Sequence, residues 1–277
     1  QQTQYWDDGD RTVRIDGGWL ASQAYTVTVK ASSRSRWGDA MGGDAVLGFS
    51  VAAIAPTVYL KTTGPFSVYN AFTPQVAYLD VVNSPEVDLR LSRVSADELA
   101  ALTISEQRWD RRERFTPADA DRLRSWTVDA QSPLNSFRRV STTLGTAPGG
   151  LLEPGLYDLR LERLKDAQST LLLVSNSNLT LKRAPGEVVV WATDLRSGKP
   201  LRDMPITVRG LPAGDGGQTD GDAARAPVDL AAGRTDADGV FRSALSAAVD
   251  PWAPILAISE VDGRVVAARL LGDELDE

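Results

Sequence analysis

The feature that most constrains this chain is an alternation of apolar and polar residues with a period of two. Because successive side chains of a β-strand point to opposite faces, each alternating segment can bury one face and expose the other. Such strands build antiparallel sheets that pack face to face, so the pattern predicts an all-β fold of tandem antiparallel β-sandwiches. The apolar positions are Tyr25, Val27 and Val29, then Val87, Leu89 and Leu91, then Tyr157, Leu159 and Leu161.

Turn signals separate the predicted strands. Asp-Gly at 262–263 lies between the apolar segments 255–261 and 265–271. This dipeptide favours a two-residue type I′ hairpin, in which both central residues take positive φ. We interpret Asp-Gly at 238–239 in the same way, and Ser-Gly at 197–198 as another strand-to-strand turn.

Two short segments interrupt the β pattern. Ser95 and Glu98 form a capping box, which predicts a short helix that ends at about Leu102. Thr116, followed by proline at the first helical position, predicts a second helix that ends at about Trp126.

Proline-containing segments at 55–56 and 184–186 suggest two domain boundaries. If modules in series shear or rotate against one another, segment 184–186 is the expected hinge. The predicted modules are residues 1–56, residues 57–184 with a helical insertion at about 94–130, and residues 185–277.

The first module holds strand candidates only around 12–15, 25–30 and 46–51. These are few for a sandwich, so we expect this module to be truncated or completed by sequence outside the 277 residues. The chain begins with glutamine and lacks the basic and apolar regions of a signal peptide, so we take it to be excised from a longer protein.

Two further segments are interpreted as loops. The segment 214–226 is rich in Gly, Asp and Ala, which predicts a flexible or disordered loop. The segment 108–114 is a mixed charge cluster, interpreted as a solvated face anchored by Trp109 rather than as a binding site.

Composition argues against several classes of function. The chain has no cysteine and no histidine, so it can form no disulfide, thiolate nucleophile or histidine-based triad. Its net charge of −7 disfavours nucleic acid and anionic membranes, and it has no apolar run of the roughly 18 residues that a membrane-spanning helix needs. We therefore predict no enzyme, no catalytic, cofactor-binding or metal-binding residue, and no membrane insertion.

Acidic and aromatic residues leave alternatives open. Asp236, Asp238 and the acidic segment 7–10 lack the spacing of a calcium-binding EF-hand loop, and turn chemistry explains them. A glycosidase would need two carboxyls at a set separation, which the scattered Asp and Glu do not indicate. The seven tryptophans leave a carbohydrate-binding or adhesive sandwich open as the alternative function, but we expect core or interdomain packing for most of them. Trp19 and Trp191 are predicted to be core. Trp6, Trp37, Trp109 and Trp252 are candidates for exposure, and the seventh is Trp126.

The segment 171–208 resembles the junction between successive macroglobulin domains of bacterial alpha-2-macroglobulins. It reads LLLVSNSNLTLKRAPGEVVVWATDLRSGKPLRDMPITV. The segment 233–241, GRTDADGVF, resembles the T-D-x-x-G-x-F hairpin of those domains, and 254–271 resembles their final hairpin. Segments within 20–51, which include LASQAYTVTV and LGFSV, resemble the second half of a bacterial Ig-like domain.

The resemblance implies a parent protein of the cell envelope, periplasmic or extracellular, that traps proteases. In that family a protease cuts a bait segment, and in many members a Cys-Gln thioester then captures it. This chain has no cysteine for a thioester, and no segment is identifiable as bait. The resemblance therefore implies a structural scaffold, whose partners are neighbouring domains of the parent chain and, through the whole protein, the trapped proteases.

Overall fold

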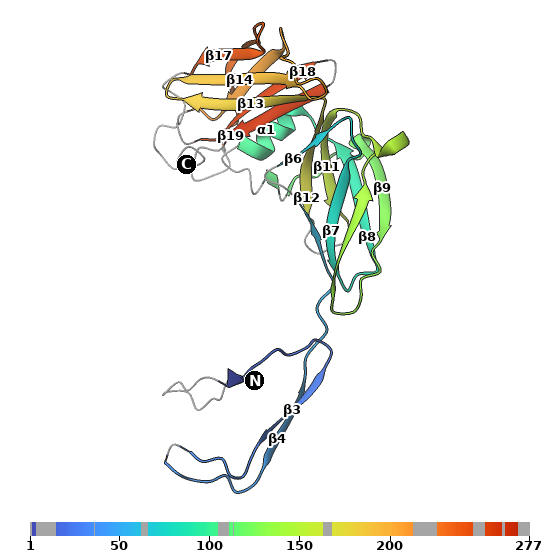
Figure 1. The fold of residues 1–277 in the computed structure, drawn as a ribbon, viewed down its shortest axis with the longest axis vertical. Helices are drawn as coiled ribbons and strands as arrows, with labels where there is room; N and C mark the ends of the chain where they lie inside the picture. The colour runs from blue at the N-terminus through green and yellow to red at the C-terminus, as the bar shows by residue number, and fades with distance from the viewer. Residues whose placement is uncertain are drawn as a thin grey trace. The chain divides into compact units, whose positions relative to one another are not determined.

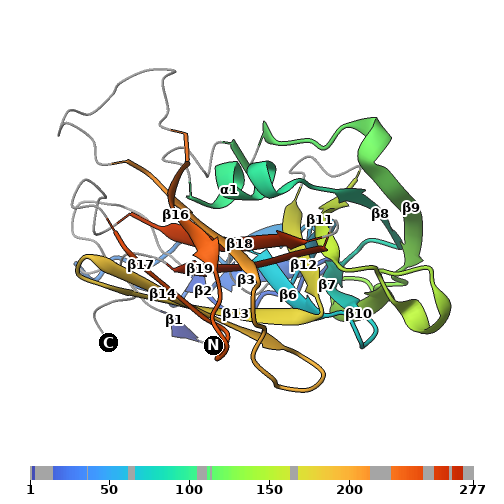
Figure 2. The same cartoon turned by 90° about the horizontal axis from the view of Figure 1, so that it is seen from above.

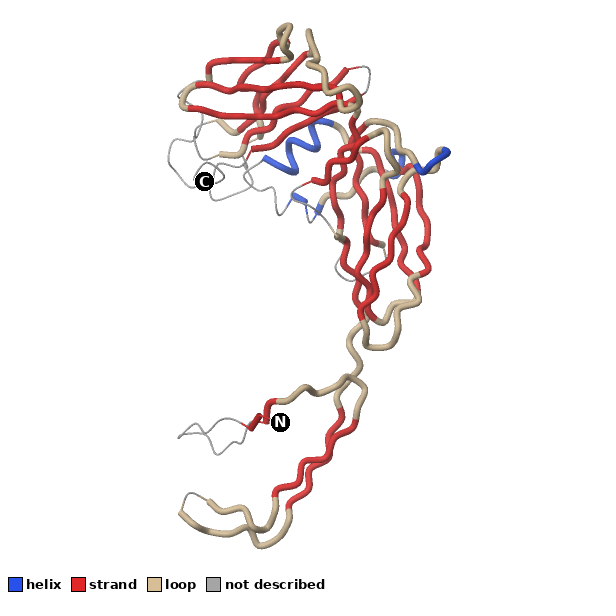
Figure 3. The backbone as a smooth tube through the Cα atoms, viewed as in Figure 1, coloured by secondary structure: helices blue, strands red, loops and turns tan. Residues whose placement is uncertain are grey.

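The computed structural model divides the chain into two compact units. Unit 1 is Gln1–Val58, Val81–Pro85 and Ala130–Arg138, and unit 2 is Tyr59–Asp80, Glu86–Asp129 and Arg139–Glu277. Strands dominate the chain, as predicted (Figures 1 and 3). The structure describes residues 2–3, 15–35, 37–61, 66–104, 111–112, 114–162, 168–212, 226–245, 253–261 and 264–270.

Unit 1 contains two two-stranded sheets. Strand β1 (Gln2–Thr3) pairs with β2 (Ile15–Asp16), and β3 (Ala24–Val29) pairs with β4 (Ala45–Ser50), as the alternation predicts. In the β3–β4 hairpin Tyr25 lies opposite Phe49, and Trp19 packs edge-on against both rings. Among the described residues of 15–57 no side chain is buried, so this hairpin has no enclosed core there.

Two asparagines connect separate parts of unit 1. The Asn83 side chain donates to the Ile54 carbonyl at 2.6 Å and accepts from the Asn135 backbone N–H at 2.6 Å. Asn135 in turn accepts from the Ile54 N–H at 2.9 Å and donates to the Ser22 hydroxyl at 2.9 Å. Ser22 and both asparagines have positive φ, a conformation that asparagine tolerates better than most residues.

The middle sandwich packs a five-stranded sheet against a three-stranded sheet. Neighbouring strands of the larger sheet are antiparallel except β6 and β12, which run parallel. The larger sheet has the order β6 (Phe66–Asn70), β12 (Ser169–Ser175), β11 (Gly155–Leu161), β8 (Glu86–Arg93), β9 (Arg122–Asp129), and the smaller has β10 (Phe137–Thr143), β7 (Val76–Val82), β5 (Thr57–Leu60). The 3₁₀ turns η1 (Asp119–Asp121) and η2 (Pro148–Gly150) lie in its connections.

The last sandwich has a three-stranded and a four-stranded sheet (Figure 2). Its core lies between them and includes the fully buried Val190, Ile206, Val208 and Ala257. The sheets have the orders β13 (Ser177–Ala184), β14 (Glu187–Asp194), β17 (Val240–Ala244) and β16 (Val228–Arg234), β15 (Pro205–Gly210), β18 (Ile255–Val261), β19 (Arg264–Leu270).

The first predicted helix is confirmed and the second is wrong. Helix α1 (Ala96–Ile104) begins at the capping box, in which the Ser95 hydroxyl accepts from the Glu98 N–H and the Glu98 carboxylate accepts from the Ser95 N–H. The segment after Thr116 forms the short turn η1 and then strand β9. The local helix signals are overridden because the edge of β8 is open to pairing, and β9 pairs with it along Glu86–Ser92 with one irregularity between Leu91 and Ser92.

The predicted turns have different outcomes. Val261 pairs with Arg264, which confirms a two-residue hairpin between β18 and β19, although residues 262–263 lie outside the described part. The turn at 238–239 is wrong as a hairpin, because β16 and β17 belong to different sheets and only Gly239 has positive φ. The turn at 197–198 is confirmed: the Asp194 carboxylate accepts two backbone N–H groups there, and hydrogen bonds with Ser197 lower the pKa of Asp194.

A surface ion cluster joins the strands of the smaller sheet of the middle sandwich. Arg139 of β10 donates to both carboxylate oxygens of Asp80 on β7, at 2.7 and 3.1 Å, and Lys61 lies 3.1 Å from the same carboxylate. These contacts, with the Arg139 hydrogen bond foremost, lower the pKa of Asp80 to about 2.

We predict that Asp80→Asn lowers the free energy of unfolding at neutral pH by about 0.5–1 kcal/mol. A carboxyl with a lowered pKa in the folded state stabilises the fold above its unfolded pKa of about 3.9 and loses this effect as the pH falls through about 2. Urea denaturation at pH 7 and pH 2 should therefore show a larger difference between variant and wild type at the higher pH. The control is Glu260→Gln, at an exposed carboxyl; an equal loss in both variants would contradict the prediction.

Candidate functional site at the joint between the two sandwiches

At the joint between the middle and last sandwiches, one residue, Asn176, separates strand β12 from strand β13. Strand β12 ends at Ser175 and β13 begins at Ser177, while the expected hinge 184–186 is the turn between the paired strands β13 and β14. Proline and glycine mark both domain linkers and hairpin turns, and Gly186 has the positive φ of a tight turn. The three-module division stays a prediction, for which we propose a boundary at Asn176.

One apolar core extends through this joint. It combines α1 and strands β6, β11 and β12 of the middle sandwich with strands β18 and β19 of the last one. Helix α1 contacts β18, and the two views show it between the sheets of the two sandwiches (Figures 1 and 2). The buried members are Phe66, Val94, Leu99, Ala100, Leu102, Ile104, Leu156, Leu171, Leu173, Leu256, Ile258, Val265 and Ala267.

Two arginines of the last sandwich reach across the joint. Arg209 of β15 lies 2.5 Å from the Asp97 carboxylate on α1 and 3.0 Å from Asp229 of its own sandwich. Arg196, in the turn after β14, stacks over the Phe72 ring with its guanidinium carbon 4.2 Å from the centroid. Neither arginine stands out in the sequence, because the partners across the joint, Asp97 and Phe72, are more than 100 residues away along the chain.

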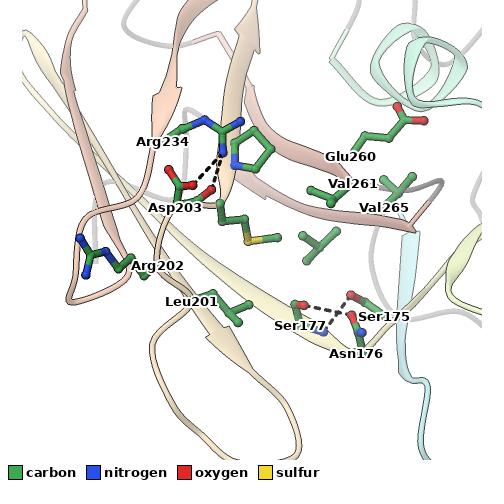
Figure 4. A pocket seen from close by; sticks show the side chains of 13 residues that line it. Ser175, Asn176, Ser177, Leu201, Arg202, Asp203, Arg234, Glu260, Val261 and Val265 are labelled. Carbon is green, nitrogen blue, oxygen red and sulfur yellow. Dashed lines mark hydrogen bonds and ion pairs between the residues drawn. The ribbon is translucent and has the colours of Figure 1, made fainter.

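A cavity of about 560 Å³ opens beside the joint, between the ends of the strands of the last sandwich (Figure 4). Leu201, Met204 and Val261 line it with apolar groups, and Arg234 and Asp203 turn towards each other at one side. Its lining residues include no histidine or cysteine and no pairing of a nucleophile with a general base. The lining therefore combines apolar side chains with one ion pair.

The structure overturns one expectation about strand β11. The alternation predicts a solvated face, but Asp158 and Arg160 are 1% and 9% exposed, because the segment around Phe115 covers that face. Arg160 lies 3.4 Å from Asp158, donates to the Phe115 carbonyl and reaches the Thr116 hydroxyl at 3.4 Å. Burial raises the pKa of Asp158, and Arg160 opposes this shift only in part.

The predicted mixed charge cluster, residues 108–114, directly precedes this covering segment in the chain. Arg111 and Arg114 are exposed, as a solvated face requires, but Arg112 is half-buried near Asp158, and burial lowers its pKa. Trp109, the predicted anchor, lies outside the described residues, as does almost all of the predicted loop 214–226.

The tryptophan predictions are partly wrong. Trp191 is 45% exposed because Val190 and Ala192 beside it on β14 occupy the inward positions, and its indole N–H donates to the Asp238 carbonyl at 3.2 Å. Trp19 is 38% exposed rather than core. Trp37 is exposed, as expected. Trp126 of β9 is half-buried, and Trp6, Trp109 and Trp252 lie outside the described residues.

The acidic residues considered as calcium ligands have a turn role where the structure describes them. The Asp236 carboxylate accepts the N–H groups of Asp238 and Val240, both at 2.9 Å. Within the described residues there is no group of three or more potential metal ligands, and residues 7–10 lie outside that part. No helix among those residues is long and apolar enough to cross a membrane.

The chain matches no protein-family model and no curated protein sequence. Its structure, however, is similar to solved structures of bacterial alpha-2-macroglobulins. A mutant of Salmonella alpha-2-macroglobulin matches 94% of the chain with a TM-score of 0.65 and 16% identity. The fold is that of bacterial macroglobulin domains. The 277 residues cover only 16% of that Salmonella protein.

Two pieces of Escherichia coli alpha-2-macroglobulin show the macroglobulin fold at the scale of this chain. The piece that spans domains MG0-NIE-MG1 matches 94% of the chain, over 83% of its own length, with a TM-score of 0.56 and 15% identity. The piece that spans NIE-MG1 matches 78% of the chain, over 97% of its own length, with a TM-score of 0.53 and 16% identity. At these identities the likeness shows the fold.

Proposed function

We propose that this chain is a structural scaffold of a bacterial alpha-2-macroglobulin-like inhibitor that traps proteases. The observation that carries the proposal is the similarity of 94% of the chain to a three-domain piece of such a protein. The continuous core at the joint supports a positioning role, because it sets the orientation of one sandwich against the next. The partners of the scaffold are neighbouring domains and, through the whole protein, the trapped proteases. The parent is a cell-envelope protein.

The proposal assigns no chemistry to these residues. A thioester needs a cysteine, which the chain lacks, and the cavity beside the joint is lined by both apolar and polar residues without a cysteine. The scaffold acts by geometry: it places active segments of the longer protein, and it is inert when it is alone.

The test compares the full-length parent with the 277-residue chain. After incubation with trypsin, the parent should protect the bound protease from a large protein inhibitor while small chromogenic substrates are still cleaved. The isolated chain at the same concentration should leave both reactions unchanged. Failure of the parent to protect trypsin would contradict the trap, and inhibition by the isolated chain would contradict the inert scaffold.

A further inference from the structure

The connection between the middle and last sandwiches is short and held on both sides. Only Asn176 separates β12 from β13. Its carbonyl accepts the Leu195 N–H at 2.9 Å, and the Ser177 N–H donates to the Ser175 hydroxyl at 3.1 Å. A linker of one residue with these contacts leaves little freedom for the two sandwiches to pivot.

Helix α1 fills the space between the two sandwiches. Leu99 and Ile104 of the helix are fully buried in one cluster with Leu173 of β12 and with Leu256 and Ile258 of β18. Opening the joint would expose apolar side chains of both sandwiches to water at once. The free-energy cost grows with the apolar area that is exposed. The helix therefore acts as a wedge whose two faces belong to one core.

Polar contacts hold the edges of this wedge. Arg209 binds Asp97 in the first turn of α1, at 2.5 Å. The stacking of Arg196 on Phe72 joins the loop after β14 to the loop after β6. A rotation that kept one of these contacts would have to break the other or deform the core between them.

We infer that α1 locks the middle and last sandwiches into one rigid body. A longer protein that contains this chain can rearrange, but the joint at Asn176 keeps its geometry, and the movement is taken up elsewhere. This inference rests on the apolar core at the joint and on the contacts of Arg209 and Arg196 across it. It does not depend on whether the parent traps proteases.

Double electron–electron resonance, which measures the distance between two spin labels, tests directly whether the joint is rigid. Because the chain has no native cysteine, spin labels attach only at introduced ones, and Ser141→Cys with Ala244→Cys places one exposed label on each sandwich. The wild-type background should give a single narrow distance distribution. A broad or two-peaked distribution would overturn the rigid body.

Two serine substitutions in α1 distinguish the effect of helix packing at the joint from the effect of intrinsic helix stability. Leu102→Ser removes a buried member of the joint core, whereas Ala101→Ser carries at least as large a helix-propensity cost at a half-buried position outside that core. With amide correlation spectra showing both sandwiches folded, Leu102→Ser should broaden the distribution and Ala101→Ser should not. If Leu102→Ser does not fold, Leu102→Ala replaces it. A narrow distribution in the folded Leu102 variant would overturn α1 as the lock.

Discussion

Leu256→Ala is expected to lower the free energy of unfolding of unit 2 by about 2–5 kcal/mol, the range for a large-to-small change in a close-packed core. Leu256 is fully buried on β18, within the core that α1 shares with both sandwiches. The cavity therefore opens at the joint, where atoms from α1, β12 and β19 lose contacts together. Urea denaturation followed by circular dichroism measures the loss.

The matched control is Val261→Ala on the same strand. Val261 is 41% exposed at the end of β18, so its truncation should change the free energy of unfolding by no more than about 0.5 kcal/mol. Equal losses in the two variants would show that position on β18, rather than burial in the shared core, sets the cost.

Arg160→Met is expected to destabilise the middle sandwich by about 3–5 kcal/mol at neutral pH, because it leaves the buried Asp158 carboxylate without its nearest cation. The double variant Asp158→Asn/Arg160→Met should recover much of this loss, since the buried carboxylate charge is then removed and only the half-buried Arg112 loses a counter-charge. Denaturation midpoints of the two single variants, the double variant and the wild type form a complete cycle.

The loss in Arg160→Met should shrink as the pH falls. Burial raises the pKa of Asp158, so the folded state binds this proton more tightly than the unfolded chain, and stability rises as the pH falls from above the raised pKa towards the unfolded value of about 3.9. Without Arg160 this raised pKa rises further. Midpoints at pH 7 and pH 5 measure the effect. A loss that is independent of pH, or absent at pH 7, would contradict the prediction.

The local pattern of the sequence determined most of the strands and one helix. Val87, Leu89 and Leu91 predict a buried face of β8, and all three are buried. The capping box at Ser95 predicts the start of α1 because its hydrogen bonds form within a single turn. These features depend on contacts between near neighbours in the chain, and the sequence displays such neighbours directly.

The tertiary structure decided what covers each face and where the domains join. Asp158 and Arg160 alternate like solvated residues, yet the segment around Phe115 buries them. The same limit applies to the joint: Leu99 of α1 and Leu256 of β18 share one core although more than 150 residues separate them. Alternation indicates whether a strand face is apolar or polar. Whether that face is buried depends on the surface that packs against it, and here that surface comes from a distant part of the chain.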